Sequence, residues 1–503
     1  MKLYAFSVFF AVVLATQAQA RGFQTVHHPV STKSVAAQDA FDQGLTLLYG
    51  YNRTDARKHF AEAARLDPHL AIAYWGLAAA YGPNINVPMF PGFYRRAQIA
   101  LREAERLTRY ASPAERLYIR ALSVRYPTGK SDSRDPAYAA AMHKVAALLV
   151  ADSDAQTLYA ESIMNYARLY DRTKKVLTPE GEAADRVLRG VLSKHPHHIG
   201  ANHLLIHADE IMRHPADAAS AARYLSTIHL DAGESHLVHM GGHVFAQIGD
   251  WPAMLAGSKI ATDDDLIEER RVPNDPEITT YHRHNTDFLT GAALMMGDDQ
   301  AMHSAARELA RINAPALALY YLRVGNWKGV LNLKRPAGPD GRGLWLFARA
   351  IAAAQTDDNA SSQAAVRELD RERRASPQND DLQMFSNLAS ARIHACSSSS
   401  EALFKSALKL QRSRFFEDYF IWYFPVAQWY GESLMARGDL SKARSVLQSA
   451  LASEVANPYI TEDLARADDR LGLKASAASR RAAYVATWKA ARSPGLEITC
   501  RRL

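Results

Sequence analysis

Cysteine is nearly absent from this sequence, in which only Cys396 and Cys500 occur among 503 residues. One disulfide between them is possible in an oxidising compartment, but two cysteines cannot form a disulfide framework or a zinc knuckle. Long hydrophobic runs are also missing, because no segment after the N-terminal stretch offers the roughly eighteen uncharged apolar residues that a membrane span requires. These absences favour an ordinary packed core and predict no membrane span in the mature chain.

Several familiar signatures of enzyme chemistry are missing too. The sequence has no glycine-rich phosphate loop, no serine nucleophile elbow and no HExxH helix, which argues against the hydrolases that depend on them. Its formal net charge of +7 is mild for this length, and no long block of basic residues occurs. Nucleic-acid binding is therefore not expected.

Alanine-rich helical periodicity is what the sequence has in abundance, from about Ser34 nearly to the C-terminus and without a convincing strand. Near the start, gaps of 12, 4, 3 and 5 separate Gly44, Ala56, Phe60, Ala63 and Pro68. The gaps 12, 4 and 3 return late in the chain at Gly431, Ala443, Leu447 and Ala450. This spacing is typical of a tetratricopeptide repeat (TPR), whose small residues mark the close approach of two antiparallel helices. We predict an all-α fold, a TPR-like α-solenoid of antiparallel helix pairs.

The first twenty residues have the pattern of a secretory signal. Lys2 precedes an apolar run, and Ala18-Gln19-Ala20 supplies a small–x–small cleavage site. We therefore expect a signal peptide over 1–20 and a periplasmic or secreted mature chain. A TPR-like solenoid with a histidine-rich site is expected over 34–335, and C-terminal TPR-like helical repeats over 343–490. Irregular connections are expected at 82–92, 126–136 and 272–279, where proline, glycine and polar residues gather.

Histidine is concentrated in one region, because twelve of the nineteen histidines fall between His195 and His284. Two phrases each place three polar side chains on one helix face. In GANHLLIHADE these are His203, His207 and Glu210, at i, i+4 and i+7. In ESHLVHMGGHVF they are His236, His239 and His243, at i, i+3 and i+7. The flanking His195, His197 and His198 precede a helix start, where we expect solvent exposure.

Imidazoles aligned on a helix face are what a transition metal needs, whereas an ordinary core helix would carry leucine or alanine there. The alternative is a set of buried, hydrogen-bonded histidines that shape a groove. We expect helices over about 199–212, 216–228, 235–248 and 252–269, and from about 280 to 296. Because the first helices of successive solenoid units lie side by side, these phrases should meet on the concave face. The preferred ligands are His203, His207, His239 and His243, with His236 and His284 in reserve.

Several phrases in the same order resemble a family of bacterial tetratricopeptide-like proteins, over roughly residues 41–309. They are AYWGLAAAYGPNIN, SPAERLYIRAL, LYAESIM, IGANHLLIHADE, GESHLVHMGGHVF and HRHNTDFL. The resemblance implies cofactor-binding roles for Asn84, Asn86, Glu161 and Asn285 beside the histidines. This sequence departs from the family pattern at Gly241, where proline is usual, and at Asp287, where histidine is usual. The resemblance implies no particular reaction.

The preferred interpretation is a metal-dependent enzyme that uses zinc, copper, iron or manganese. Glu210 would be a general base that takes a proton from metal-bound water, or a further ligand. Six histidines exceed one tetrahedral site, so either two ions bind or some histidines support the ligands. The alternatives are a non-catalytic TPR scaffold that holds a peptide or protein in its groove, and a periplasmic metal carrier.

Overall fold

The computed structural model describes residues 26–127, 134–171, 174, 176–212, 216–228, 233, 235–312, 314–414, 425–452 and 456–490. The side chains of residues 210–212, 314, 339–340 and 413–414 lie outside this description. The predicted signal peptide and Cys500 also lie outside the described residues. Cys396 is disulfide-bonded.

Helices make up most of the described chain. The helices of its first half are α1 (Val35–Tyr49), α2 (Arg53–Leu66), α3 (Ala71–Ala79), α4 (Phe93–Arg106), α5 (Pro113–Arg125), α6 (Asp135–Leu148), α7 (Ser153–Met164), α8 (Pro179–Leu192), α9 (Ile199–Met212), α10 (Ala219–Leu225), α11 (Ser235–Ile248) and α12 (Trp251–Arg271). Those of the second half are α13 (Pro276–Met296), α14 (Asp299–Ile312), α15 (Ala314–Arg323), α16 (Trp327–Asn332), α17 (Pro339–Gln355), α18 (Asn359–Ala375), α19 (Asp380–Ile393), α20 (Ser400–Arg414), α21 (Val426–Arg437), α22 (Leu440–Leu451), α23 (Pro458–Arg470) and α24 (Lys474–Val485).

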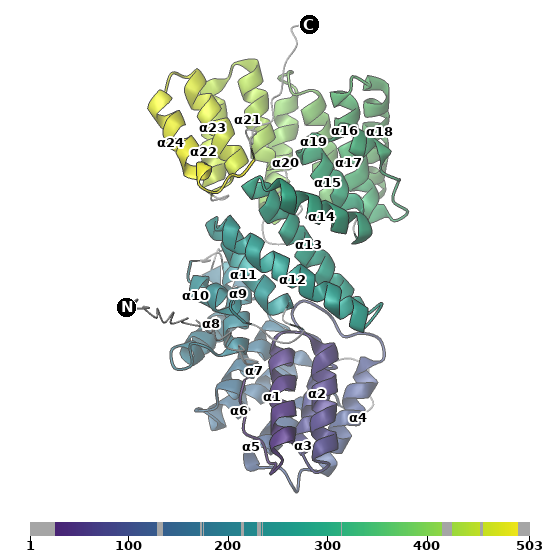
Figure 1. The fold of residues 1–503 in the computed structure, drawn as a ribbon, viewed down its shortest axis with the longest axis vertical. Coiled ribbons are helices and arrows are strands. Elements are labelled where there is room, and N and C mark those ends of the chain that lie inside the picture. Colours follow the sequence, from purple (N-terminus) through teal and green to yellow (C-terminus); the bar gives the residue numbers. More distant parts are fainter. Residues whose placement is uncertain are drawn as a thin grey trace, which may run out of the picture.

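The helices form an all-α, TPR-like solenoid, as the sequence predicted. Consecutive helices pack as pairs, and odd-numbered helices also contact one another, as α9 does with α11 and α11 with α13. In a solenoid of helix pairs this second set of contacts joins the first helices of successive units. The array runs from α1 and α2 at one end of the molecule, through α12 and α13 in the middle, to α24 at the other end (Figure 1).

The array also curls enough to bring non-neighbouring units together. Helix α1 contacts α9, and α13 contacts α23. At the second contact the hydroxyl of Tyr459 donates to the carbonyl of Leu294 at 2.9 Å, and the indole nitrogen of Trp251 donates to the carbonyl of Ala456 at 2.8 Å. The first contact brings residues from the start of the chain to the histidine-rich helices.

Small residues allow the helix pairs to approach closely, as the repeat spacing predicted. A Cβ atom on Gly44 would lie 2.8 Å from the ring of Phe60, and one on Gly76 would lie 2.4 Å from it. A Cβ atom on Gly431 would lie 2.7 Å from the side chain of Leu447. Phe60 and Leu447 are fully buried, so each glycine makes room for a core side chain of the second helix.

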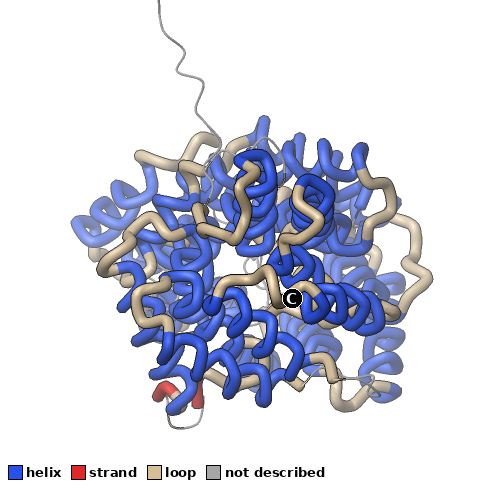
Figure 2. Tube along the Cα trace, turned by 90° about the horizontal axis from the view of Figure 1, so that it is seen from below, coloured by secondary structure: helices blue, strands red, loops and turns tan. Residues whose placement is uncertain are grey.

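The expected bounds of α9 and α11 are confirmed, while three details differ. Helix α10 is shorter than the expected 216–228, and α13 begins at Pro276 rather than near residue 280. The early start follows from Asp275, whose side chain caps the helix immediately before a proline in its first turn. One strand pair also occurs, β1 (Tyr170–Asp171) with β2 (Val176–Leu177), at the edge of the molecule (Figure 2). Strands of two residues are too short for periodicity to reveal.

Within the described residues, none of the helices combines the length and apolar character needed to cross a bilayer.

Candidate metal centre

Six histidines from three neighbouring helices form two groups in the interior of the solenoid. Ligand atoms within each group lie within 4.8 Å of one another. The first group joins α9 to the start of α11, and its members are His203, His207 and His236. The second joins the rest of α11 to α13, and its members are His239, His243 and His284. All are buried except the half-buried His284.

The proton positions of His203 are fixed by helix α1. Its Nδ1 lies 2.5 Å from the carbonyl oxygen of Tyr49, which is one of the carbonyls left without an intrahelical partner at the end of α1. Because a carbonyl can only accept, Nδ1 carries the hydrogen and Nε2 keeps its lone pair. A second-sphere carbonyl of this kind is the usual partner of a metal-binding histidine.

The nitrogen atoms of the first group have the spacing of ligands around one ion. His203 Nε2 lies 3.1 Å from Nε2 of His236 and 3.1 Å from Nε2 of His207. Two ligands of a tetrahedral site with metal–nitrogen bonds of about 2.0–2.1 Å lie roughly 3.3 Å apart. The observed separations differ from this value by a few tenths of an ångström, so little movement would admit an ion.

The second group is tighter. His239 Nε2 lies 2.8 Å from Nε2 of His243, and the ring of His284 lies 4.6 Å from the ring of His239, centroid to centroid. The ring of Phe288 packs 4.1 Å from His239 and 4.7 Å from His243. An aromatic ring beside the imidazoles limits the water that reaches them, which strengthens electrostatic interactions within the site.

The two groups adjoin each other. The rings of His236 and His239 are stacked with centroids 6.0 Å apart, and those of His207 and His243 lie 6.5 Å apart. Two ions held by these groups would therefore occupy adjacent positions.

Burial keeps three of the imidazoles neutral. It lowers the pKa of His203, His236 and His239 well below the ordinary value, and neighbouring histidines lower each pKa further. Both effects disfavour the imidazolium form, because charge in a desolvated site is costly and like charges repel. Neutral imidazole is the form that binds metal, so the site is ready for an ion at neutral pH.

The structure corrects the expected grouping by helix face. The sequence placed His236, His239 and His243 together, whereas His236 joins the α9 histidines and His284 completes the other group. Residues at i and i+7 are about 10.5 Å apart along a helix axis, given a rise of 1.5 Å per residue. His236 and His243 are therefore too far apart to bind the same ion, while the i, i+4 pair His239 and His243 can share one.

Asn285 and His198 have different positions from those expected. The side chain of Glu210, the candidate general base, lies outside the described residues. Asn285 does not face the histidines, because its amide donates to Asp265 at 2.6 Å. Asp265 also accepts from Ser235 at the start of α11, so Asn285 helps to position that helix. His198 is buried rather than exposed, with Nε2 3.2 Å from Asp154, while His195 and His197 are exposed.

The loop between α3 and α4 supplies the predicted asparagines. The side-chain oxygen of Asn84 accepts from the backbone nitrogens of Asn86 and Val87, at 3.0 and 2.7 Å, which shapes the loop. The amide nitrogen of Asn86 lies 3.4 Å from Nε2 of His236. Burial raises the pKa of Tyr281, and the amides of Asn86 and Asn84 oppose this effect. Asn86 thus reaches the first histidine group, whereas Asn84 supports the loop that carries it.

Glu161 on α7 is half-buried, not the surface residue that its sequence context alone would suggest. Burial raises its pKa to about 7, against the opposing effect of Arg125 and Arg53. The burial of Tyr51 raises the pKa of that phenol, and the charge of Glu161 raises it further. Glu161 therefore lies within electrostatic reach of a ring that packs on the histidines.

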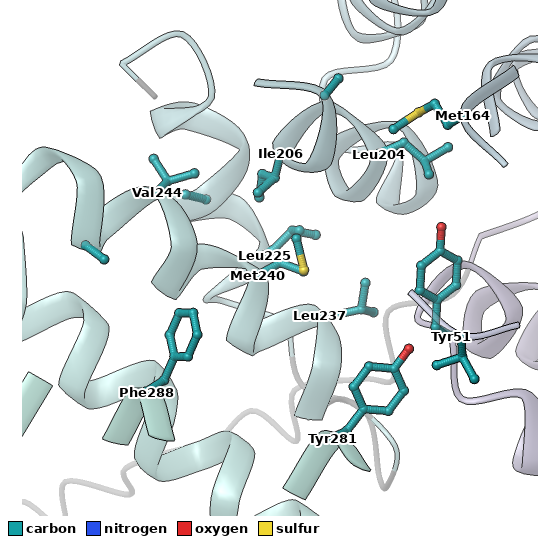
Figure 3. Close-up of a cluster of buried hydrophobic side chains, with 14 of the residues drawn as sticks. Tyr51, Met164, Leu204, Ile206, Leu225, Leu237, Met240, Val244, Tyr281 and Phe288 are labelled. Atoms are coloured by element: carbon teal, nitrogen blue, oxygen red, sulfur yellow. The ribbon is translucent and has the colours of Figure 1, made fainter. Parts of the chain in front are cut away.

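Two tyrosines next to the first group were not singled out in the sequence. The ring of Tyr51 lies 4.6, 5.5 and 6.2 Å from the rings of His203, His236 and His207. The ring of Tyr281 lies 4.5 Å from that of His236 and points toward Tyr51 (Figure 3). Tyr51 has φ 58, a left-handed conformation that bulky residues rarely adopt and that often marks functional sites. No local pattern in the sequence could reveal it.

Apolar residues form the wall behind the histidines. Leu204 and Ile206 of α9 and Leu237, Met240 and Val244 of α11 are all buried, and Figure 3 shows them gathered between these helices. Met240 packs in this cluster. The histidines of α9 and α11 thus lie on one side of these helices, and other positions of the same helices belong to the core.

Comparisons with known proteins give the following results. The crystal structure of the P58(IPK) TPR domain is similar at 14% sequence identity and a TM-score of 0.20, covering 82% of this chain and 99% of that chain. A structure of Naa15/Naa10 bound to HypK-THB is similar at 14% identity and a TM-score of 0.22, covering 91% of this chain and 64% of that one. This chain thus spans less than two thirds of the second chain's length. No family model and no curated protein matches the sequence.

Proposed function

We propose that this protein is a metal-dependent enzyme whose active centre holds two transition-metal ions side by side on a TPR-like solenoid. The observation that supports the proposal is the pair of three-histidine groups, whose ligand atoms lie within 4.8 Å of one another in each group. The carbonyl of Tyr49 orients His203 so that its Nε2 lone pair points at the other two imidazoles of the first group.

Three imidazoles for each ion favour catalysis over a structural role. Structural zinc sites have four protein ligands, whereas catalytic sites have three and leave a position for water or substrate. An ion with an open position lowers the pKa of bound water or polarises a substrate oxygen. Glu210 follows His207 by one helical turn in α9, and we propose that it accepts the proton from that water.

The ligand chemistry narrows the choice of metal. Imidazole nitrogen suits zinc, copper and iron, while manganese prefers carboxylate and water oxygen. Because six neutral donors supply no negative charge, we propose copper, zinc or iron rather than manganese. Export to the periplasm or beyond the cell, as the N-terminal signal predicts, remains part of this proposal.

Metal analysis of three variants tests the proposal. The full chain, purified without chelator and reconstituted with zinc, copper or iron, should bind up to about two ions as counted by elemental analysis. His203→Ala should lose the ion of the first group, and His243→Ala that of the second, since each removes a ligand. His195→Ala serves as the control, because His195 is exposed and belongs to neither group.

A metal content that stays near zero after reconstitution with each ion would refute the proposal. It would favour the scaffold interpretation, in which the histidines only shape a groove for a peptide. Unchanged metal content in all three variants would show that the ions bind elsewhere. Bound metal that exchanges freely in a protein without any turnover would favour the carrier instead.

A further inference from the structure

Several buried hydrogen-bond donors near the histidine centre have no partner among the described residues, and four of them lie close to Gly82 or Glu161. These four are the hydroxyls of Tyr51 and Tyr126 and the Nη2 atoms of Arg53 and Arg125. None of the four residues is more than 5% exposed. Buried polar groups in native proteins are nearly always paired, because otherwise their lost bonds to water are not replaced. Four such donors in one region indicate a missing acceptor.

Three of these four residues meet at Gly82, in the loop between α3 and α4. Arg53 donates to the carbonyl of Gly82 through Nη1. A Cβ atom on Gly82 would lie 2.5 Å from the hydroxyl of Tyr126 and 3.3 Å from Nη1 of Arg125. The absence of a side chain at Gly82 therefore lets the phenol and both guanidinium groups lie close to its backbone.

Glu161 faces the same region from α7. Both Arg125 and Arg53 oppose the effect of burial on its pKa, and Glu161 in turn affects Tyr51 and Tyr138. The carboxyl group of Glu161 is thus near the donors, yet it forms no hydrogen bond with any of these four described donors.

Ion pairs already fix the orientation of both guanidinium groups. Nε of Arg53 lies 2.7 Å from Glu277, and Nε of Arg125 lies 2.7 Å from Asp135. Each pair uses one edge of its arginine and leaves Nη2 for another acceptor. These two carboxylates balance the two arginines, and Glu161 also lies near them, so the region has no surplus positive charge. A singly charged ligand therefore fits better than a doubly charged phosphate.

We propose that these four donors form a subsite for the carboxylate group of a small organic molecule. The carboxylate oxygens accept from Nη2 of Arg53 and Arg125, since guanidinium geometry matches a carboxylate. The hydroxyls of Tyr51 and Tyr126 bond to the remaining lone pairs. Because the ring of Tyr51 also packs 4.6 Å from His203, the subsite would hold a substrate beside the histidine centre. That last role rests on the proposed function, whereas carboxylate binding itself requires no metal.

Calorimetric titration of the metal-free full chain tests the subsite, with acetate as the probe and acetamide as its uncharged counterpart. Acetate should bind saturably and at least about tenfold more tightly than acetamide, because charge-assisted hydrogen bonds are the stronger kind. Tyr126→Phe should weaken acetate binding by about five- to tenfold. The variant should melt no lower than the parent, since the free hydroxyl has no partner to lose.

Tyr118→Phe is the matched control. The hydroxyl of Tyr118 donates to Asp152 at 2.7 Å, so this variant should lose stability and keep the acetate affinity of the parent. The proposal fails if the metal-free parent does not bind acetate, if acetamide binds equally well, or if Tyr126→Phe leaves the affinity unchanged. Because the titration uses metal-free protein, these outcomes are independent of whether the histidines bind metal.

Discussion

Replacing Glu161 by glutamine should stabilise the protein at neutral and alkaline pH, but not in acid. Burial raises the pKa of Glu161 from 4.5 to about 7. Between these two pH values, Glu161 therefore keeps its proton in the folded state but has already released it in the unfolded state. Stability must fall as pH rises through this window, and it stays reduced above it.

The size of the effect follows from the same values. A difference of about 2.5 pH units corresponds to about 3 kcal/mol, at about 1.36 kcal/mol for each unit. This figure is an upper value, because Glu161 is only half-buried and water screens part of the cost. Glutamine keeps the shape of the side chain and cannot ionise, so it removes the pH dependence that this residue contributes.

Urea denaturation of the parent and of Glu161→Gln, followed by circular dichroism from about pH 4 to 8, measures the difference. The stabilities of the two proteins should be closest near pH 4, and the variant should gain by up to about 3 kcal/mol near pH 8. Glu180→Gln, at an exposed position in the first turn of α8, is the control and should show no such trend. A constant difference between variant and parent across this range would refute the assignment of a raised pKa to Glu161.

Three further predictions test the fold and the centre. Gly76→Ala should destabilise the protein by about 1–3 kcal/mol in urea denaturation, because the new methyl group would meet the ring of Phe60 at 2.4 Å; an unchanged midpoint would contradict the tight helix pairing. Glu210→Gln should retain bound metal while any turnover falls by roughly 10²–10⁴-fold, as expected for a general base; parallel loss of metal would instead identify a ligand. A chain that ends after Ala310 keeps all six histidines, so it should still take up metal by elemental analysis, although it loses the contact of α23 with α13. Loss of helicity in that truncated chain, measured by circular dichroism, would mean that the C-terminal units are required for the N-terminal ones to fold.

The sequence predicted the helices around the histidines because their pattern is local. Spacing of three, four and seven residues places side chains on one face whatever the surroundings, which is why α9 and α11 have the expected bounds. How the histidines combine across helices depends on the rotation and offset of one helix against the next. The sequence therefore identified His236 as a candidate but assigned it to the wrong group.

Residues that reach the histidines from distant parts of the sequence could not be predicted from local sequence patterns. Tyr49 and Tyr51 reach the histidines only because α1 packs against α9, some 150 positions later in the chain. Arg53 and Arg125, whose Nη2 atoms lack a partner among the described residues, belong to α2 and α5. Nothing in their sequence context distinguishes them from surface arginines. Long-range packing, rather than periodicity, decides their surroundings.

The contact between α1 and α9 changes how the first nine helices depend on one another. An open array of repeats tolerates the gain or loss of a unit, because each unit meets only its neighbours. Here α1 fits against α9 through a close approach in which a Cβ atom on Gly200 would lie 2.4 Å from the ring of Tyr49. An inserted or deleted repeat anywhere between them would shift this closure and remove the carbonyl that orients His203. The need to orient His203 therefore constrains the number of units in this part of the chain. Repeat arrays in general can vary in length, whereas a change of length between α1 and α9 would displace the Tyr49 carbonyl.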